Sequence, residues 1–111
     1  MKTISTHILD TNRGRPASKV SVSLEVERGA VWHQVGDSIT NEDGRISHFG
    51  NVTLEKSLYR LTFDTKQYFE NLELPTFYPR VQIVFYVDDP SDHYHVPLLL
   101  SAHGYSTYRG S

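Results

Sequence analysis

Cysteine is absent from this chain of 111 residues, and methionine and tryptophan occur once each. Without cysteine the chain can form no disulfide bond and offers no thiol nucleophile. It also has no Gly-X-Ser-X-Gly segment, the sharp turn that presents the nucleophilic serine of many hydrolases. We therefore expect no covalent acyl-enzyme chemistry.

Neither sign of charge is in excess, because 11 lysines and arginines stand against 13 aspartates and glutamates, for a net charge of −2. This balance does not favour binding to nucleic acid or to anionic membranes. No apolar run approaches the roughly 20 residues that span a bilayer, and the first seven residues lack the apolar core of a signal peptide. The composition predicts a soluble, cytoplasmic protein.

Repeats, low-complexity tracts and linker-like segments are also missing. The length falls in the range of one domain, so residues 1–111 are expected to fold together.

Alternation of apolar and polar residues is the main pattern that is present. It is cleanest over residues 20–27, where valine and leucine alternate with serine and glutamate. Side chains of a strand point alternately to its two faces, so such alternation predicts half-buried strands. Similar segments are residues 4–9, 31–35, 59–63, 81–87 and 94–100, and the turn-forming segments between them include 10–16, 41–45 and 88–92.

One short helix is predicted after residue 63. Asp64 or Thr65 can cap its first turn, Tyr68 and Phe69 begin an apolar face, and Pro75 marks its end. Seven or eight short strands with a single short helix predict an all-β fold, an antiparallel β-sandwich.

Some of these strands are apolar on both faces. Leu9 lies opposite Ile8, while Pro97 and Leu99 lie opposite Leu98. The outer face of an isolated sandwich should be polar, because it contacts water. The pattern therefore predicts a homo-oligomer in which another subunit covers one sheet, without giving the number of subunits.

Three polar residues stand out along the predicted strands and turns. His7 and His95 lie on strand faces opposite the apolar residues, and Arg45 follows the turn-forming pair Asp43-Gly44. Each also has a simpler interpretation, as a surface histidine with an ordinary hydrogen bond or as a solubilising arginine.

A metal site is an alternative for the histidines. His93 and His95 are two positions apart and project to the same side of a strand, with His48, His33 or His103 available as a third ligand. Zinc needs three or four such ligands that converge, and spacing alone does not establish convergence.

The final segment, residues 108–111, reads Tyr-Arg-Gly-Ser, and the segment 95–101 reads His-Val-Pro-Leu-Leu-Leu-Ser. Four further segments match the same pattern: Thr-His-Ile-Leu-Asp-Thr at 6–11, Gly-Arg-Pro-Ala at 14–17, residues 40–45 and residues 77–81. In their order along the chain, all these segments resemble the motifs of the 5-hydroxyisourate hydrolases, which are transthyretin-like proteins of urate catabolism. One departure is the pair Ala102-His103, because the family usually has proline after the serine. A polar edge strand is the alternative for the final segment.

The resemblance implies a transthyretin-like fold, a homotetramer with sites in a channel between subunits, and no cofactor or metal. The implied reaction is hydrolysis of 5-hydroxyisourate to 2-oxo-4-hydroxy-4-carboxy-5-ureidoimidazoline in purine degradation. The implied catalytic residues are His7, Arg45 and His95, and the implied substrate-binding residues are His7, Arg45, Tyr108, Arg109, Gly110 and Ser111. If the terminal residues line the site, the chain end must be docked, and Gly110 would allow a close backbone approach.

These residue types suit the implied chemistry. A histidine can accept a proton from water near neutral pH, and the guanidinium of Arg45 can stabilise a developing oxyanion. The competing interpretation is a carrier, because transthyretin shares the fold and binds small hydrophobic hormones. Carriers lack the Tyr-Arg-Gly-Ser end and the histidine pair, which favours the hydrolase; fold alone would not decide between them.

Overall fold

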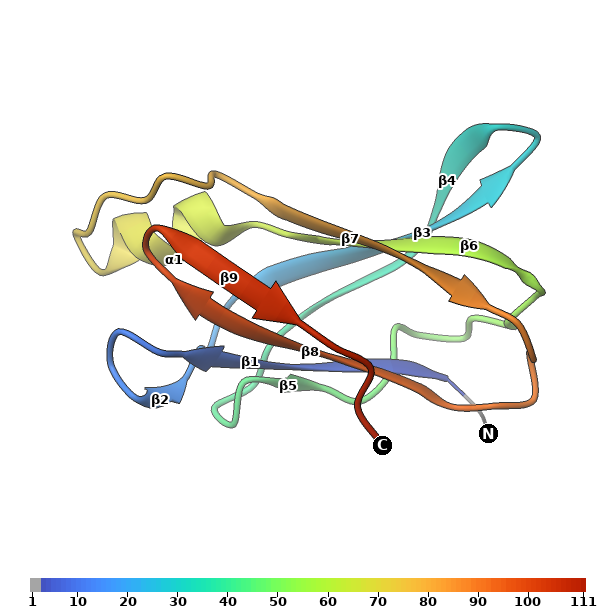
Figure 1. Cartoon of the computed structure of the whole chain (residues 1–111), viewed down its shortest axis with the longest axis horizontal. Helices are drawn as coiled ribbons and strands as arrows, with labels where there is room; N and C mark the ends of the chain where they lie inside the picture. Colours follow the sequence, from blue (N-terminus) through green and yellow to red (C-terminus); the bar gives the residue numbers. More distant parts are fainter. Residues whose placement is uncertain (1–2) are drawn as a thin grey trace.

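The computed structural model describes residues 3–111 as two β-sheets packed face to face, with one helix at one end (Figure 1). The elements are β1 (Ile4–Asp10), β2 (Arg15–Pro16), β3 (Ser21–Arg28), β4 (Val31–Ile39), β5 (Arg45–Ile46), β6 (Ser57–Phe63), α1 (Thr65–Asn71), β7 (Val81–Val87), β8 (Tyr94–Ser101) and β9 (Gly104–Thr107). Sheet A has the order β2-β1-β8-β9, with β5 also paired to β1, and sheet B has the order β4-β3-β6-β7. The predicted all-β sandwich with one short helix is confirmed. No helix among residues 3–111 is long and apolar enough to cross a membrane.

The core lies between the two sheets and is built by alternate residues of each strand. On β3, Val22, Leu24 and Val26 are buried, while the residues between them are partly exposed. The largest buried apolar side chains include Ile4, Ile8, Phe49, Tyr59, Leu61, Phe63, Phe69, Leu98 and Leu100. The alternation in the sequence therefore identified the inward-facing residues of the longer strands.

One strand pair departs from the antiparallel pattern that the sequence suggested. β1 and β8 run parallel, with Ile4 opposite Tyr94 and Asp10 opposite Leu100. The whole of sheet B lies between them in the chain, so β8 enters sheet A from the same end as β1. A parallel pair needs such a long connection, whereas antiparallel pairs can be joined by a tight turn.

The two-residue strands β2 and β5 lie in segments where only turns were expected, which raises the total to nine strands. β4 also continues to Ile39, four residues beyond the predicted segment.

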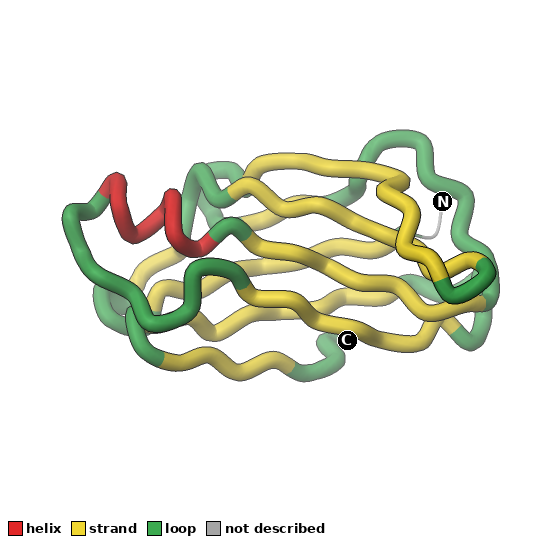
Figure 2. The backbone as a smooth tube through the Cα atoms, turned by 90° about the horizontal axis from the view of Figure 1, so that it is seen from above, coloured by secondary structure: helices red, strands yellow, loops and turns green. Residues whose placement is uncertain are grey.

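Helix α1 is capped as the sequence indicated, and the structure shows that it is also anchored to β1. The Asp64 carboxylate accepts the amide hydrogen of Gln67, the expected capping bond. Tyr68 donates its hydroxyl to the buried carboxylate of Asp10, which also accepts the amide hydrogen of Asn12. These bonds connect the helix to the end of β1, and Figure 2 shows the helix beyond one end of the strands.

The outer faces of the two sheets differ in chemistry. On sheet B, the Arg60 guanidinium makes two hydrogen bonds of 2.8 Å to Glu25 and lies 4.5 Å from the centre of the Trp32 ring. On sheet A, Leu9 and Leu99 are adjacent and only half-buried. The apolar outer face expected from the sequence therefore belongs to sheet A.

Candidate active site

The parallel pairing of β1 and β8 brings residues from opposite ends of the chain together. Ser5 lies opposite His95, and His7 lies opposite Pro97. Neighbouring strands are about 4.8 Å apart, so these side chains are close neighbours. His7 and His95 are half-buried on the outer face of sheet A, whereas the residues flanking them along each strand face the core. The prediction that both histidines point away from the core is confirmed.

Arg45 reaches the same face through a turn that requires glycine. Gly44 has φ of +72°, and a Cβ atom there would lie 2.5 Å from the carbonyl oxygen of Ile8. The side chain of Asn41 accepts the amide hydrogen of Arg45 at 3.0 Å and so fixes the turn. Arg45 consequently lies opposite His7 in the pairing of β5 with β1.

The C-terminal segment is docked against β8. The amide of Gly110 donates to the carbonyl oxygen of His95 at 2.8 Å. A Cβ atom at Gly110 would lie 2.6 Å from Cδ2 of His95 and 3.2 Å from Cγ of Pro97. The expected docking of the chain end, and the close approach of backbone at Gly110, are both confirmed.

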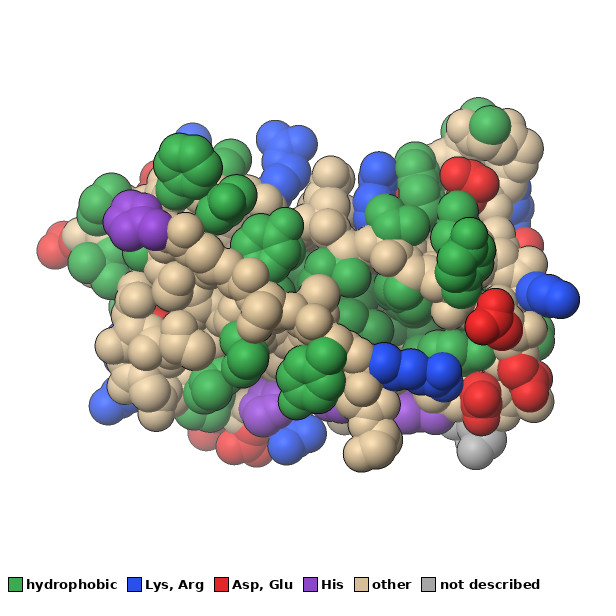
Figure 3. All heavy atoms as spheres, viewed as in Figure 1, with side chains coloured by type: hydrophobic (Ala, Val, Ile, Leu, Met, Phe, Trp, Pro, Cys, Tyr) green, Lys and Arg blue, Asp and Glu red, His purple; other side chains and the backbone are tan. Residues whose placement is uncertain are grey.

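β1, β5, β8 and the C-terminal segment border a cavity of about 300 Å³ that opens on the outer face of sheet A. Its lining residues are Ser5, Thr6, Arg45, Ile46, Ser47, His93, His95 and Ser111. Histidine side chains gather along the lower edge of Figure 3, on both sides of the C-terminal segment. Of the residues named by the resemblance, Arg45, His95 and Ser111 line the cavity, and His7 is next to Arg45 in the strand pairing.

Tyr108 and Arg109 lie elsewhere. Together with residues of β7 and β8, they line a second hollow of about 220 Å³, which shares only His95 with the first cavity. Tyr108 is exposed, and the Arg109 guanidinium lies 4.7 Å from the centre of the Tyr94 ring and 3.8 Å from the Asp92 carboxylate. Within one chain, these two side chains do not reach the cavity that holds Ser111.

Ser5 is the residue that the sequence interpretation missed. Its hydroxyl oxygen lies 2.7 Å from Nδ1 of His95 and 3.0 Å from Nε2 of His93, and the residue is only 8% exposed. A signal was available, because Ser5 is two positions before His7 and therefore on the same face of the strand.

The two histidines that raised the metal alternative do project to the same side, and the hydroxyl of Ser5 lies between them. Across residues 3–111, no three histidine, cysteine, aspartate or glutamate side chains are placed to hold a metal ion.

Electrostatics favour the neutral form of His95. Burial lowers the pKa of His95 below its ordinary value of 6.5, and electrostatic interactions with Arg45, His7 and His93 lower it further. At neutral pH the imidazole is therefore uncharged, the form that can accept a proton.

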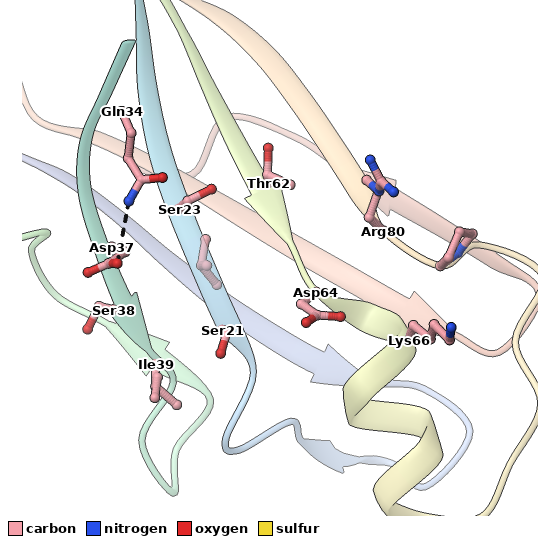
Figure 4. Close-up of a pocket in the computed structure, with 12 residues that line it drawn as sticks. Ser21, Ser23, Gln34, Asp37, Ser38, Ile39, Thr62, Asp64, Lys66 and Arg80 are labelled. Atoms are coloured by element: carbon pink, nitrogen blue, oxygen red, sulfur yellow. Dashed lines mark hydrogen bonds between the residues drawn. The ribbon is translucent and has the colours of Figure 1, made fainter. Parts of the chain in front are cut away.

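A larger hollow of about 600 Å³ lies over the outer face of sheet B and is drawn in Figure 4. Gln34 there donates a hydrogen bond of 3.4 Å to Asp37, and Asp64 is engaged as the helix cap. No histidine is among its lining residues, so it offers no group that transfers protons near pH 7.

The chain was compared with known proteins. Residues 4–110 match the model of the HIUase/Transthyretin family. A 5-hydroxyisourate hydrolase of Salmonella dublin is 45% identical over 109 residues, which cover 97% of this chain and 80% of that protein. The structure of Klebsiella pneumoniae 5-hydroxyisourate hydrolase superimposes with a TM-score of 0.87 at 40% identity, covering 99% of this chain and 100% of that one. Sea bream transthyretin in complex with thyroxine superimposes with a TM-score of 0.89 at 29% identity, covering 96% of this chain and 93% of that one.

Proposed function

The chain belongs to the HIUase/transthyretin family, and from that premise we propose that it hydrolyses 5-hydroxyisourate by direct attack of water, in the degradation of urate. The observation that supports this proposal best is the convergence of three distant segments on one cavity. Arg45, His95 and Ser111 come from β5, β8 and the C-terminal segment, and all three line it.

Arg45 is proposed to stabilise the transition state. When water adds to the lactam carbonyl carbon, negative charge develops on the carbonyl oxygen. A guanidinium can donate two parallel hydrogen bonds to such an oxygen or to neighbouring oxygens of the substrate. The turn at Gly44 fixes the backbone of Arg45 beside the cavity before the substrate binds.

His95 and His7 are proposed to move the protons. One imidazole accepts a proton from the attacking water, and a proton is delivered to the ring nitrogen as its bond to the carbonyl carbon breaks. The carbonyl carbon then becomes a carboxyl group. His95 is neutral at pH 7 because its pKa is lowered by burial and by nearby positive charges, which suits it to accept the first proton.

The terminal segment is proposed to bind the substrate. Ser111 lines the cavity, where it can hydrogen-bond ring oxygens and nitrogens, and the bond from the Gly110 amide to the His95 carbonyl holds the segment there. We assign Tyr108 and Arg109 to substrate binding as well, from the resemblance of residues 108–111 to the family motif. Because their side chains lie outside the cavity in one chain, this assignment needs a site completed by a second subunit.

Assembly as a homotetramer is proposed on two different surfaces. The outer face of sheet A is apolar around Leu9 and Leu99. β7, an edge strand of sheet B, exposes Val84 and Tyr86. Two distinct self-complementary surfaces generate a dimer of dimers. A cytoplasmic location also remains a prediction.

A direct assay tests the reaction. 5-Hydroxyisourate is generated freshly with urate oxidase, and the loss of its ultraviolet absorbance is followed with and without the protein. We expect the protein to accelerate the decay well above the spontaneous rate, and to do so equally after dialysis against a strong chelator. Decay at the spontaneous rate would refute the hydrolase, and activity that depended on added zinc would favour the metal alternative.

The second candidate is a small-molecule carrier, because the thyroxine complex of sea bream transthyretin shares the fold. A carrier would bind 5-hydroxyisourate or a hydrophobic ligand in a saturable manner without consuming it. Turnover of many substrate molecules per subunit distinguishes the enzyme from the carrier.

A further inference from the structure

Two residues of the cavity, His93 and Ser5, have no role in the proposed mechanism. The Ser5 hydroxyl has one proton to donate and two lone pairs, and it lies 2.7 Å from Nδ1 of His95 and 3.0 Å from Nε2 of His93. It can therefore donate to only one ring and must accept from the other if both bonds form. The protonation of the two imidazoles is coupled through this one oxygen.

The environment of these groups makes the coupling strong. Ser5 is buried, so water competes poorly for its hydroxyl, and its backbone is fixed by the β1–β8 pairing. His93, in contrast, is exposed just before β8 begins. The three groups form a path from the buried side of the cavity to solvent.

We infer that Ser5 and His93 are positioning residues for His95, and that with it they form a proton relay. This inference rests on the proposed function, because it concerns how the base of that reaction works. In the resting state Nδ1–H of His95 donates to Ser5, and the Ser5 hydroxyl donates to Nε2 of His93. This direction leaves the Nε2 lone pair of His95 free to accept a proton; the opposite direction would occupy it.

The relay also moves the positive charge from His95 to the solvent-exposed His93. When His95 takes a proton from water at Nε2, its Nδ1 proton passes to Ser5 as the Ser5 hydroxyl proton passes to Nε2 of His93. Ser5 is neutral before and after, and one positive charge has moved from His95 to His93. On His95 that charge would be near Arg45 and His7, whereas His93 is hydrated and next to Asp92 in the chain.

Two substitutions interrupt the relay in different ways. Ser5→Ala removes the shared hydroxyl, and His93→Gln keeps a hydrogen-bonding group that cannot take up a proton. Ser5→Thr retains the hydroxyl and tests whether that group restores the relay, whereas His103→Gln changes an exposed histidine in the β8–β9 turn and serves as the control.

For Ser5→Ala and His93→Gln we expect kcat to fall about 10- to 100-fold, less than for loss of the base itself, with KM nearly unchanged. His93 is one of the groups that lower the pKa of His95, so its replacement should raise that pKa and move the acidic limb of the kcat/KM profile of His93→Gln to higher pH. Ser5→Thr should recover part of the rate lost in Ser5→Ala, and His103→Gln should keep the kinetics of the unaltered enzyme. A purely structural role of Ser5 or His93 would leave the pH profile in place.

A second measurement does not depend on activity. Nitrogen-15 NMR of the imidazoles, recorded without substrate, should show the proton of His95 at Nδ1 in the unaltered protein and a mixture of tautomers in Ser5→Ala. A mixed population in the unaltered protein, or wild-type kcat and pH profile in Ser5→Ala and His93→Gln, would overturn the relay. Failure of the unaltered protein to hydrolyse 5-hydroxyisourate would instead refute the proposed function, and the tautomer measurement would still decide whether the hydrogen-bonded chain exists.

Discussion

At the scale of single residues, Gly110 is a tightly constrained position of the candidate site. Any side chain there would meet the His95 ring at 2.6 Å and Pro97 at 3.2 Å. The contact is with a ring on a paired strand rather than with a flexible tip, so either His95 or the terminal segment has to move.

We therefore expect Gly110→Ala to lower kcat/KM by about 100-fold, the cost of a displacement near 1 Å in a catalytic site. The melting temperature should change little, because the contact lies outside the core. Gly104→Ala is the matched control, since its nearest neighbour would be 3.7 Å away. Steady-state assays measure kcat/KM of both variants. Equal values for Gly110→Ala and Gly104→Ala would show that the C-terminal segment can shift without loss of activity.

The proposed catalytic side chains give the second prediction. His7→Ala and His95→Ala should each reduce the rate by about two to four orders of magnitude, the usual range for a positioned proton-transfer group. Arg45→Lys should also be severe, because an ammonium cannot reproduce the planar fork of donors. His33→Ala on β4 serves as a control at an exposed histidine. Near-normal turnover in a variant whose circular dichroism is unchanged would remove that residue from the mechanism.

At the scale of elements, the attachment of α1 to β1 should make the free energy of unfolding vary with pH in the alkaline range. Burial, and then the hydrogen bond to Asp10, raise the pKa of Tyr68 from 10.0 to about 12. The phenol holds its proton more tightly in the folded chain than in the unfolded chain. Its contribution to stability is therefore complete below pH 10 and is lost as the pH rises through 12, and its upper limit is roughly 2 to 3 kcal/mol.

Tyr68→Phe should remove this dependence. At pH 7 the variant should lose about 1 to 3 kcal/mol, because the buried Asp10 carboxylate loses a donor, and the loss should shrink between pH 10 and 12. Urea unfolding at pH 7, 10 and 11.5 measures both effects, with Tyr86→Phe as a control at an exposed tyrosine. If the difference in free energy of unfolding between the two proteins stayed constant across this range, ionisation of the Tyr68 phenol would not be coupled to unfolding.

The elements also show what local sequence can and cannot specify. Alternation located the longer strands and separated core residues such as Ile8 and Leu98 from the outward histidines, because burial on one face imposes a period of two. Two-residue strands such as β2 carry no period, so they could not be found. The pairing of β1 with β8 is a long-range contact that no local pattern encodes, and the contact of Ser5 with His95 depends on it.

At the scale of the whole molecule, the outer face of sheet A should control assembly. Leu99→Asp should split the proposed oligomer and abolish activity, because burying an unpaired carboxylate against another subunit costs several kcal/mol. Ile39→Asp places the same charge at an exposed position on β4 and should leave assembly unchanged. Sedimentation combined with the activity assay distinguishes the variants, and a fully active monomer would contradict the proposal.

The parallel pairing of β1 with β8 also sets an order of events during folding. All of sheet B comes from residues 21–87, and even its most distant paired residues, Val22 and Phe63, are 41 positions apart, whereas Ser5 and His95 are 90 positions apart. Closing that distance carries a large entropic cost, so sheet A should form late. The single tryptophan, Trp32, lies in sheet B and reports on the early step. During refolding from urea, its fluorescence should recover before hydrolytic activity does, and on the ribosome β1 has to wait until β8 (Tyr94–Ser101) has been synthesised.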